Sequence, residues 1–221
     1  MRLGWRESSV VLIKKGAEAS LYLEEWHTRK VIMKRRLPKR YRIPELDIMI
    51  RSQRTTHEPH IIHKAKKAGV PTPTIFMVDV ADSNIVMEFV EGKQVKEVLD
   101  NISEEERLSM SKLIGKMIGR LHKNGIIHGD LTTSNMILTP FDKIVFVDFG
   151  LSEMSVELEP KGVDIHLMKR TLNSTHYKHA EECFKALMEG YAEAVGNEQT
   201  KKVLNKIREI EKRGRYVANR K

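Results

Sequence analysis

The first third of the chain alternates short apolar runs with turn residues, a pattern typical of β-strands. The runs "SVVLIKK", "SLYLEE" and "RKVIMKR" are rich in β-branched and apolar residues, and "IFMVDV" and "NIVMEFV" flank the turn "ADS" further along. We therefore predict three strands and, after them, a β-hairpin. Between these elements, residues 45–68 predict a helix that ends at Gly69 and the proline-containing "VPTPT" stretch.

The remainder of the chain has the period of amphipathic helices. Ser103 and Glu106 form a capping box ahead of a long apolar stripe that stops at "NG". Two later stripes predict further helices with core-facing positions at Phe184, Leu187, Met188, Tyr191 and Val195, and at Val203, Leu204, Ile207 and Ile210. The pattern predicts an α+β protein with a β-rich lobe over residues 1–91, a mainly helical lobe over 92–212 and a basic tail over 213–221.

The lengths of the apolar runs and the cysteine content indicate where the protein is located. No apolar run approaches the roughly 20 residues that cross a bilayer, and the N-terminus lacks the apolar core of a secretory signal. The chain has one cysteine, Cys183, which fits a reducing compartment. We therefore expect a cytoplasmic protein that does not bind membranes.

The chain is also basic, with 39 Lys and Arg against 30 Asp and Glu and a net charge of +9. The excess is concentrated in "KRRLPKRYR" and in the C-terminal "EKRGRYVANRK". Either run could be an ordinary solvated surface, but a positive field of this size also favours polyanions. We expect the C-terminal run to bind nucleic-acid phosphates without reading sequence.

Three oxygen-bearing side chains frame a predicted β-hairpin. Asp130 and Asn135 lie in "HGDLTTSN", and Asp148 opens "DFGLS". The apolar runs "MILTP" and "KIVFV" between them should pair across a turn, which places Asn135 beside Asp148 at one end of the hairpin. Each residue alone could cap a turn or end a strand. Together they offer the few oxygen ligands that Mg²⁺ prefers when water and phosphate complete its shell.

These motifs resemble the catalytic loop and the metal-binding motif of protein-kinase-like phosphotransferases. The resemblance implies that Asp130 is the base for the accepting hydroxyl and that Asn135 and Asp148 ligate Mg²⁺. It also implies that Lys34 of "VIMK" contacts the ATP phosphates, and that "VMEFVEG" is the hinge that holds adenine. The implied nucleotide-binding residues are Gly16, Ala17, Glu18, Ala19, Lys34, Glu58, Met87, Glu88, Val90, Asn135 and Asp148, with Asp130 and Lys34 as the catalytic pair.

A closer resemblance extends over most of the chain. The runs "KKGAEASLY", "IRSQRTTHE", "HGDLTTSN", "KGVDIHLMKRTLNSTH" and "RGRY" occur in the order found in the small atypical kinase subunit family of the KEOPS (EKC) complex. Membership would imply a two-lobed protein-kinase-like fold and an atypical serine/threonine kinase or ATPase that supports formation of tRNA threonylcarbamoyladenosine (t6A). It would also imply two protein partners, a threonylcarbamoyltransferase subunit and a subunit bound to the N-terminal lobe.

The chain departs from regulated protein kinases in several places. Its phosphate loop has one glycine, Gly16, where kinases use G-x-G-x-x-G, and the acid Glu18 suggests a loop that binds ATP loosely. Gly129 and Thr132 stand where many kinases have Arg and Lys. The segment after Asp148 is too short for a usual activation segment and has no A-P-E. We therefore expect no activation-loop switch and no peptide-binding platform.

The sequence offers two partners for Lys34, because Pro59 follows the expected partner Glu58. The residue before proline is disfavoured in a helix, so we predict a helix break there, with Glu45 as the alternative partner. His57, His60 and His63 nearby recur every three residues, but without Cys or carboxylates at metal-ligand spacing we expect solvated histidines.

Two other functions fit parts of the pattern. Small-molecule phosphotransferases of the aminoglycoside or choline kinase type also carry H-G-D and lack A-P-E, but they use a longer helical insert and acidic residues for a cationic substrate. A scaffold or RNA-binding module could keep only the fold, yet it would have no chemical need for Lys34, Asp130, Asn135 and Asp148 together. The sequence favours the ATP-dependent subunit.

Overall fold

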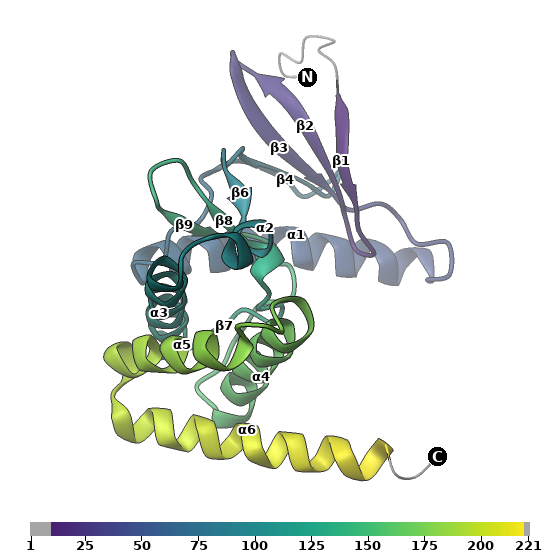
Figure 1. The fold of residues 1–221 in the computed structure, drawn as a ribbon. Helices are drawn as coiled ribbons and strands as arrows, with labels where there is room; N and C mark the ends of the chain where they lie inside the picture. The colour runs from purple at the N-terminus through teal and green to yellow at the C-terminus, as the bar shows by residue number, and fades with distance from the viewer. Residues whose placement is uncertain (1–9, 219–221) are drawn as a thin grey trace. The chain divides into compact units, whose positions relative to one another are not determined.

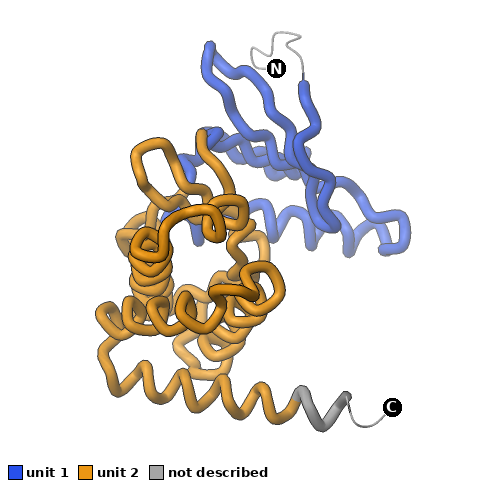
Figure 2. Tube along the Cα trace, viewed as in Figure 1, with its two compact units in different colours: residues 1–63, 73–90 blue, residues 64–72, 91–221 orange. Residues whose placement is uncertain are grey.

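The computed structural model describes residues 10–218, with side chains as far as Arg213. Contacts divide the chain into two compact units, residues 1–63 with 73–90, and residues 64–72 with 91–221 (Figure 2). The first unit holds an antiparallel sheet and the second is mainly helical (Figure 1). The α+β prediction is therefore confirmed. Residues 64–72 group with the second unit, which the sequence did not indicate.

The first unit is built on a five-stranded antiparallel sheet in the order β1-β2-β3-β5-β4. Its strands are β1 (Val11–Lys15), β2 (Ser20–Trp26), β3 (Arg29–Arg35), β4 (Ile75–Asp79) and β5 (Asn84–Glu88). The predicted strands and the β4–β5 hairpin are confirmed. Val31, Met33 and Val86 form a buried cluster on this sheet, because alternate residues of β3 and β5 point to one face.

Helix α1 (Pro44–Lys67) runs unbroken through Pro59, so the predicted break at that residue is wrong. Ile61 and Ile62, which follow the proline, are buried at 0% and 2% exposure. Burial of apolar side chains directly after the proline offsets the loss of one backbone hydrogen bond. Local propensity is overridden here by packing.

The second unit contains the remaining elements. They are β6 (Lys93–Gln94), α2 (Val95–Val98), η1 (Leu99–Asn101), α3 (Glu104–Lys123), β7 (Ile126–Ile127), η2 (Thr133–Asn135), β8 (Met136–Leu138), β9 (Ile144–Phe146), β10 (Glu153–Met154), α4 (Leu158–Thr175), α5 (Ala180–Val195) and α6 (Asn197–Ala218). The capping box of α3 is confirmed, since Ser103 Oγ accepts the Glu106 amide and Glu106 accepts the Ser103 amide.

Helix α4 has no counterpart in the prediction. The start of its buried face carries Lys161, Gly162 and Asp164, and an apolar stripe begins only further along, at Ile165, Met168 and Leu172. Helix α6 extends to Ala218, so the segment expected as a separate tail from Arg213 begins as helix, and its side chains beyond Arg213 lie outside the described part. Among the described residues, no helix has the length and apolar character needed to cross a membrane.

Helices α3 and α5 pack against each other (Figure 1), and their backbones approach most closely at two glycines. A Cβ on Gly115 would lie 1.8 Å from the Leu187 carbonyl oxygen, and one on Gly190 would lie 1.8 Å from the Lys112 carbonyl oxygen. Each glycine therefore allows the backbone of the other helix to pass where a methyl group cannot fit.

The substitution Gly190→Ala should therefore lower the free energy of unfolding by at least about 2 kcal/mol, because the new methyl group would force α3 and α5 apart. Urea unfolding monitored by circular dichroism measures the change. Lys185→Ala, on the exposed side of α5, is the control and should change stability by less than about 0.5 kcal/mol. Equal stability of Gly190→Ala and wild type would contradict the close helix crossing.

Candidate functional site

The loop before β8 holds Asp130 and Asn135 against each other. Both hydrogens of the Asn135 side-chain amide are engaged, because Nδ2 donates to the Asp130 carbonyl oxygen at 3.0 Å and to Asp130 Oδ2 at 2.8 Å. Asn135 is buried, while Asp130 is half-buried. With its nitrogen committed to Asp130, the amide is fixed in orientation, and its Oδ1 is the atom that could ligate a cation.

The predicted hairpin after this loop is confirmed. Strand β8 pairs with β9 in the register Met136 to Phe146, and the Val147 amide donates to the Asn135 carbonyl oxygen at 2.9 Å. Asp148 follows directly, so Asn135 and Asp148 lie at the same end of the hairpin. Asp148 has a φ of +62°, a left-handed conformation that is uncommon outside glycine and is concentrated at functional sites.

A close backbone contact explains why position 129 is glycine and not the arginine that is common in protein kinases. The φ of Gly129 is +78°, and a Cβ there would lie 2.2 Å from the Leu151 carbonyl oxygen. The chain just after the Asp148 motif therefore packs against the bare backbone of the loop that carries Asp130, and only glycine fits.

Asp164 of α4 anchors the same loop through its backbone. The Asp164 carboxylate, only 1% exposed, accepts hydrogen bonds from the amides of His128 at 2.7 Å and Gly129 at 2.9 Å. His122 Nε2 of α3 lies 3.3 Å from the same carboxylate, and His122 Nδ1 lies 3.0 Å from the Tyr191 hydroxyl. Sequence reasoning assigned Asp164 no role, because a single acid within a helix has no distinctive spacing.

His128 is kept neutral in this setting. Complete burial lowers the pKa of its ring, and the negative charges of Asp164, Asp148 and Asp130 oppose that shift without reversing it. The ring packs on Phe149 with a centroid distance of 4.6 Å, and its Nδ1 accepts from the Asp130 amide at 3.3 Å. An uncharged histidine thus supports the backbone that presents Asp130.

In the first unit, Lys34 of β3 forms a buried ion pair with Glu58 of α1, at 2.7 Å between Nζ and Oε1. The expected partner is therefore present, whereas Glu45 is exposed at the start of the helix. Arg36 also pairs with the other oxygen of Glu58, and all three side chains are buried. Sequence reasoning missed Arg36, which lies two residues after Lys34 and directly follows the end of β3 at Arg35.

The loop that stands at the place of a phosphate loop makes a tight turn, with the Gly16 amide donating to the Ala19 carbonyl oxygen at 2.9 Å. Glu18 is not an isolated acid, since Arg54 of α1 lies 2.5 Å from it and Arg42 lies 3.6 Å away. The negative charge expected to weaken ATP binding is therefore offset by two arginines.

The expected hinge residues continue from β5. Met87 is buried between Ile32 of β3 and Ile75 of β4. The Glu88 amide donates to the Thr74 carbonyl oxygen at 2.8 Å, and the Glu88 carboxylate accepts from the Thr74 amide at 2.9 Å. Val90 is half-buried at the end of this segment. The two hydrogen bonds with Thr74 fix the backbone at Glu88, where the expected hinge begins.

Comparison with known proteins identifies relatives over nearly the whole chain. A family model described as the RIO domain matches residues 25–163. The KEOPS complex subunit Bud32 of Pyrococcus abyssi is 49% identical and covers 93% of this chain and 96% of its own length. A probable serine/threonine-protein kinase BUD32 homolog of Archaeoglobus fulgidus is 42% identical over 91% of this chain and 94% of that protein.

A probable bifunctional tRNA threonylcarbamoyladenosine biosynthesis protein of Methanothermobacter thermautotrophicus is 45% identical over 93% of this chain. The chain spans only 36% of that longer protein. Among solved structures, the Rio2 kinase of Chaetomium thermophilum shares the fold, with a TM-score of 0.61, 18% identity, and coverage of 93% of this chain and 72% of that one. On this evidence, the chain belongs to the RIO-domain family of atypical kinases and, within it, to the Bud32 subunits of the KEOPS complex.

Proposed function

We propose that this chain is an Mg-ATP-dependent kinase or ATPase that acts within a KEOPS complex and supports t6A formation in tRNA. The observation that carries the proposal is the Asp130–Asn135 pair, fixed at the end of a hairpin that also presents Asp148. Bud32 relatives named as KEOPS subunits and as a serine/threonine kinase homolog, together with a bifunctional t6A biosynthesis relative, support the assignment.

Asn135 and Asp148 would hold Mg²⁺. The donor set fits a hard cation, because it offers an amide oxygen whose nitrogen is committed to Asp130 and a carboxylate in a fixed backbone conformation. When bound, Mg²⁺ neutralises charge on the phosphate oxygens. Among the described residues, no cluster of three His, Cys, Asp or Glu side chains suggests a different metal site.

The first unit would supply the contacts to the ATP phosphates and to adenine. Glu58 orients the Lys34 ammonium, so Lys34 can meet a phosphate without searching among rotamers. Gly16, Ala17, Glu18 and Ala19 would lie along the phosphates through their backbone amides. Adenine would be held by backbone groups of Glu88 and Val90, with Met87 as the apolar wall.

Asp130 would orient and deprotonate the nucleophile that attacks the terminal phosphate. The nucleophile is water in an ATPase and a Ser or Thr hydroxyl in a kinase. The segment between Asp148 and the start of α4 at Leu158 is short, and its strand β10 is held by pairing with β7. This segment is an unsuitable peptide platform, and we therefore propose ATP hydrolysis as the main activity and protein phosphorylation as a secondary one.

The proposed partners are a threonylcarbamoyltransferase subunit and a second KEOPS subunit bound to the N-terminal β-rich lobe, with cytoplasmic tRNA as the nucleic acid. The basic C-terminal residues would add phosphate contacts to those of the complex. Such contacts strengthen binding without selecting a base sequence.

Deleting residues 214–221 should weaken tRNA binding by the complex and reduce its dependence on salt. The slope of log affinity against log salt should fall by about 0.7–0.9 for each phosphate that the deleted residues neutralise in the wild type. The deletion keeps Arg213, whose guanidinium lies 2.5 Å from Glu159 of α4, so the helix contact is preserved. Filter binding across a salt series gives the slope, and Lys185→Gln is the charge control. An unchanged slope would assign these residues to ordinary solvated surface.

Reconstituted t6A formation tests the proposed function. The complex should make t6A with the wild-type chain and should lose most of its turnover when the chain is omitted or carries Asp148→Asn. Equal t6A yield with wild type and Asp148→Asn over repeated turnovers would contradict the ATP-dependent role.

A further inference from the structure

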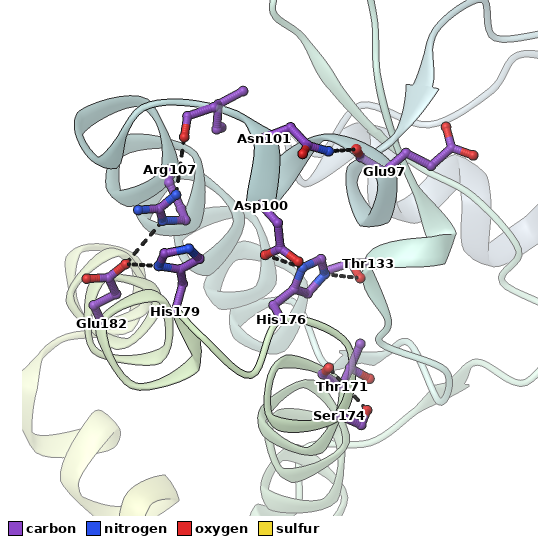
Figure 3. Close-up of polar contacts among 11 residues, drawn as sticks. Glu97, Asp100, Asn101, Arg107, Thr133, Thr171, Ser174, His176, His179 and Glu182 are labelled. Atoms are coloured by element: carbon purple, nitrogen blue, oxygen red, sulfur yellow. Dashed lines mark hydrogen bonds and ion pairs between the residues drawn. The ribbon is translucent and has the colours of Figure 1, made fainter.

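A buried histidine connects three segments of the second unit (Figure 3). His176, at the C-terminal cap of α4, places Nδ1 2.8 Å from Asp100 Oδ1 of η1 and Nε2 3.0 Å from the Thr133 hydroxyl. The His176 side chain is 0% exposed, and Thr133 is 1% exposed, whereas the Asp100 carboxylate is 38% exposed. The histidine thus links a surface carboxylate to a residue inside the catalytic loop.

The donor and acceptor chemistry fixes the orientation of each group. An ionised carboxylate only accepts, so the hydrogen lies on His176 Nδ1. In the neutral ring, Nε2 then accepts the hydroxyl hydrogen of Thr133. Both ring nitrogens of His176 and the Thr133 hydroxyl therefore have partners, and removal of any one group would leave another unpaired where water cannot replace it.

Thr133 connects these hydrogen bonds to the position of Asn135. It is the first residue of η2 (Thr133–Asn135), and Asn135 is the last residue of the same turn. Asn135 in turn holds Asp130 through its side-chain amide. A fixed Thr133 therefore fixes the turn that sets the position of both the proposed base and a proposed metal ligand.

We infer that the hydrogen-bonded series Asp100–His176–Thr133 is a positioning device for the catalytic loop, with His176 and Thr133 acting on turnover through Asn135 and Asp130. The inference rests on the proposed ATP-dependent function. None of these three residues contacts the reacting groups in this scheme, and their effect is on the geometry of groups that do.

Steady-state ATP turnover by the full chain in its KEOPS complex tests the inference. Thr133→Val keeps the side-chain shape and removes the hydroxyl, so kcat should fall about 10-fold while KM for ATP changes less than about twofold. Thr133→Ser restores the hydroxyl and should recover kcat to within about threefold of wild type. The double variant Thr133→Val with His176→Gln should be no slower than the slower single variant, because both interrupt one series of hydrogen bonds.

Thr171→Val is the matched control. Its hydroxyl donates to the Leu167 carbonyl oxygen at 3.1 Å within α4, so the substitution removes a hydrogen bond that is not part of the Asp100–His176–Thr133 series, and kcat should stay within about twofold of wild type. Circular dichroism supplies the folded fraction of each variant for correction of kcat. Three results would each overturn the inference. The folded fraction could account for the whole fall in kcat of Thr133→Val, Thr133→Ser could fail to restore kcat, or Thr133→Val and Thr171→Val could lower kcat equally. Absence of ATP turnover in the wild type would instead contradict the proposed function, and the inference with it.

Discussion

Replacing Asp130 by asparagine should lower ATP turnover by about 10²- to 10⁴-fold, the usual contribution of a positioned general base. An asparagine oxygen can still accept from the Asn135 amide, which in the wild type donates to Asp130 Oδ2 at 2.8 Å. The loop should therefore keep its geometry, and the loss should be chemical. Steady-state kinetics should show a fall in kcat, with KM for ATP nearly unchanged.

Asp130→Ala tests the catalytic and the structural role together, because it also removes the carboxylate acceptor for Asn135 and leaves only the Asp130 carbonyl oxygen. It should lose the same turnover and add a small loss of stability, about 1 kcal/mol. The matched control is Asp142→Asn in the β8–β9 turn, an exposed acid on the same hairpin, which should leave turnover unchanged. Turnover by Asp130→Asn within a few-fold of wild type would remove Asp130 from the proposed mechanism.

Loss of Glu58 should be the most damaging single change in the first unit. Glu58→Ala would leave Lys34 and Arg36 buried with their shared carboxylate gone, a situation that typically costs about 3–5 kcal/mol in unfolding free energy. It should also remove the carboxylate that orients the Lys34 ammonium and so raise KM for ATP. Urea unfolding and nucleotide titration measure the two effects.

Glu45→Ala, at the exposed start of the same helix, is the control for Glu58 and should alter neither stability nor KM. Glu58→Gln keeps the volume and some hydrogen bonding, so its effect should lie between those of wild type and Glu58→Ala. Normal nucleotide affinity and turnover in Glu58→Ala would mean that Lys34 depends on another group.

Sequence periodicity was sufficient for the main elements. Strands β1, β2 and β3, the β4–β5 hairpin, the capped helix α3 and the β8–β9 hairpin follow from local apolar patterns, and the two-lobed kinase class is confirmed by the family assignment. Periodicity failed where tertiary contacts decide. Helix α1 continues through Pro59 because the residues after it are buried. Helix α4 was missed because Lys161 and Asp164 occupy the start of its buried face, ahead of the apolar positions Ile165, Met168 and Leu172.

The residues around the site were harder to predict than the site itself. Asp130, Asn135 and Asp148 have a distinctive spacing. The hairpin between Asn135 and Asp148 is short, so its strand pairing could be predicted from the local sequence. Arg36, Asp164 and His176 act through partners far away in the sequence, Glu58, the His128 backbone and Thr133. A single chain carries no signal for such pairings, because each residue alone is ordinary.

ATP hydrolysis by the wild-type chain, measured alone, with tRNA, and with its KEOPS partners and tRNA together, tests the central claim most directly. An assembly prepared without the chain measures contaminating ATPase activity, and Asp148→Asn in the full assembly measures the turnover that does not depend on this carboxylate. We predict Mg²⁺-dependent turnover that is low for the isolated chain and strongly stimulated in the complete assembly, with no stimulation in Asp148→Asn. Turnover that is unaffected by partners and tRNA, or that survives in Asp148→Asn, would contradict an ATPase role in tRNA modification.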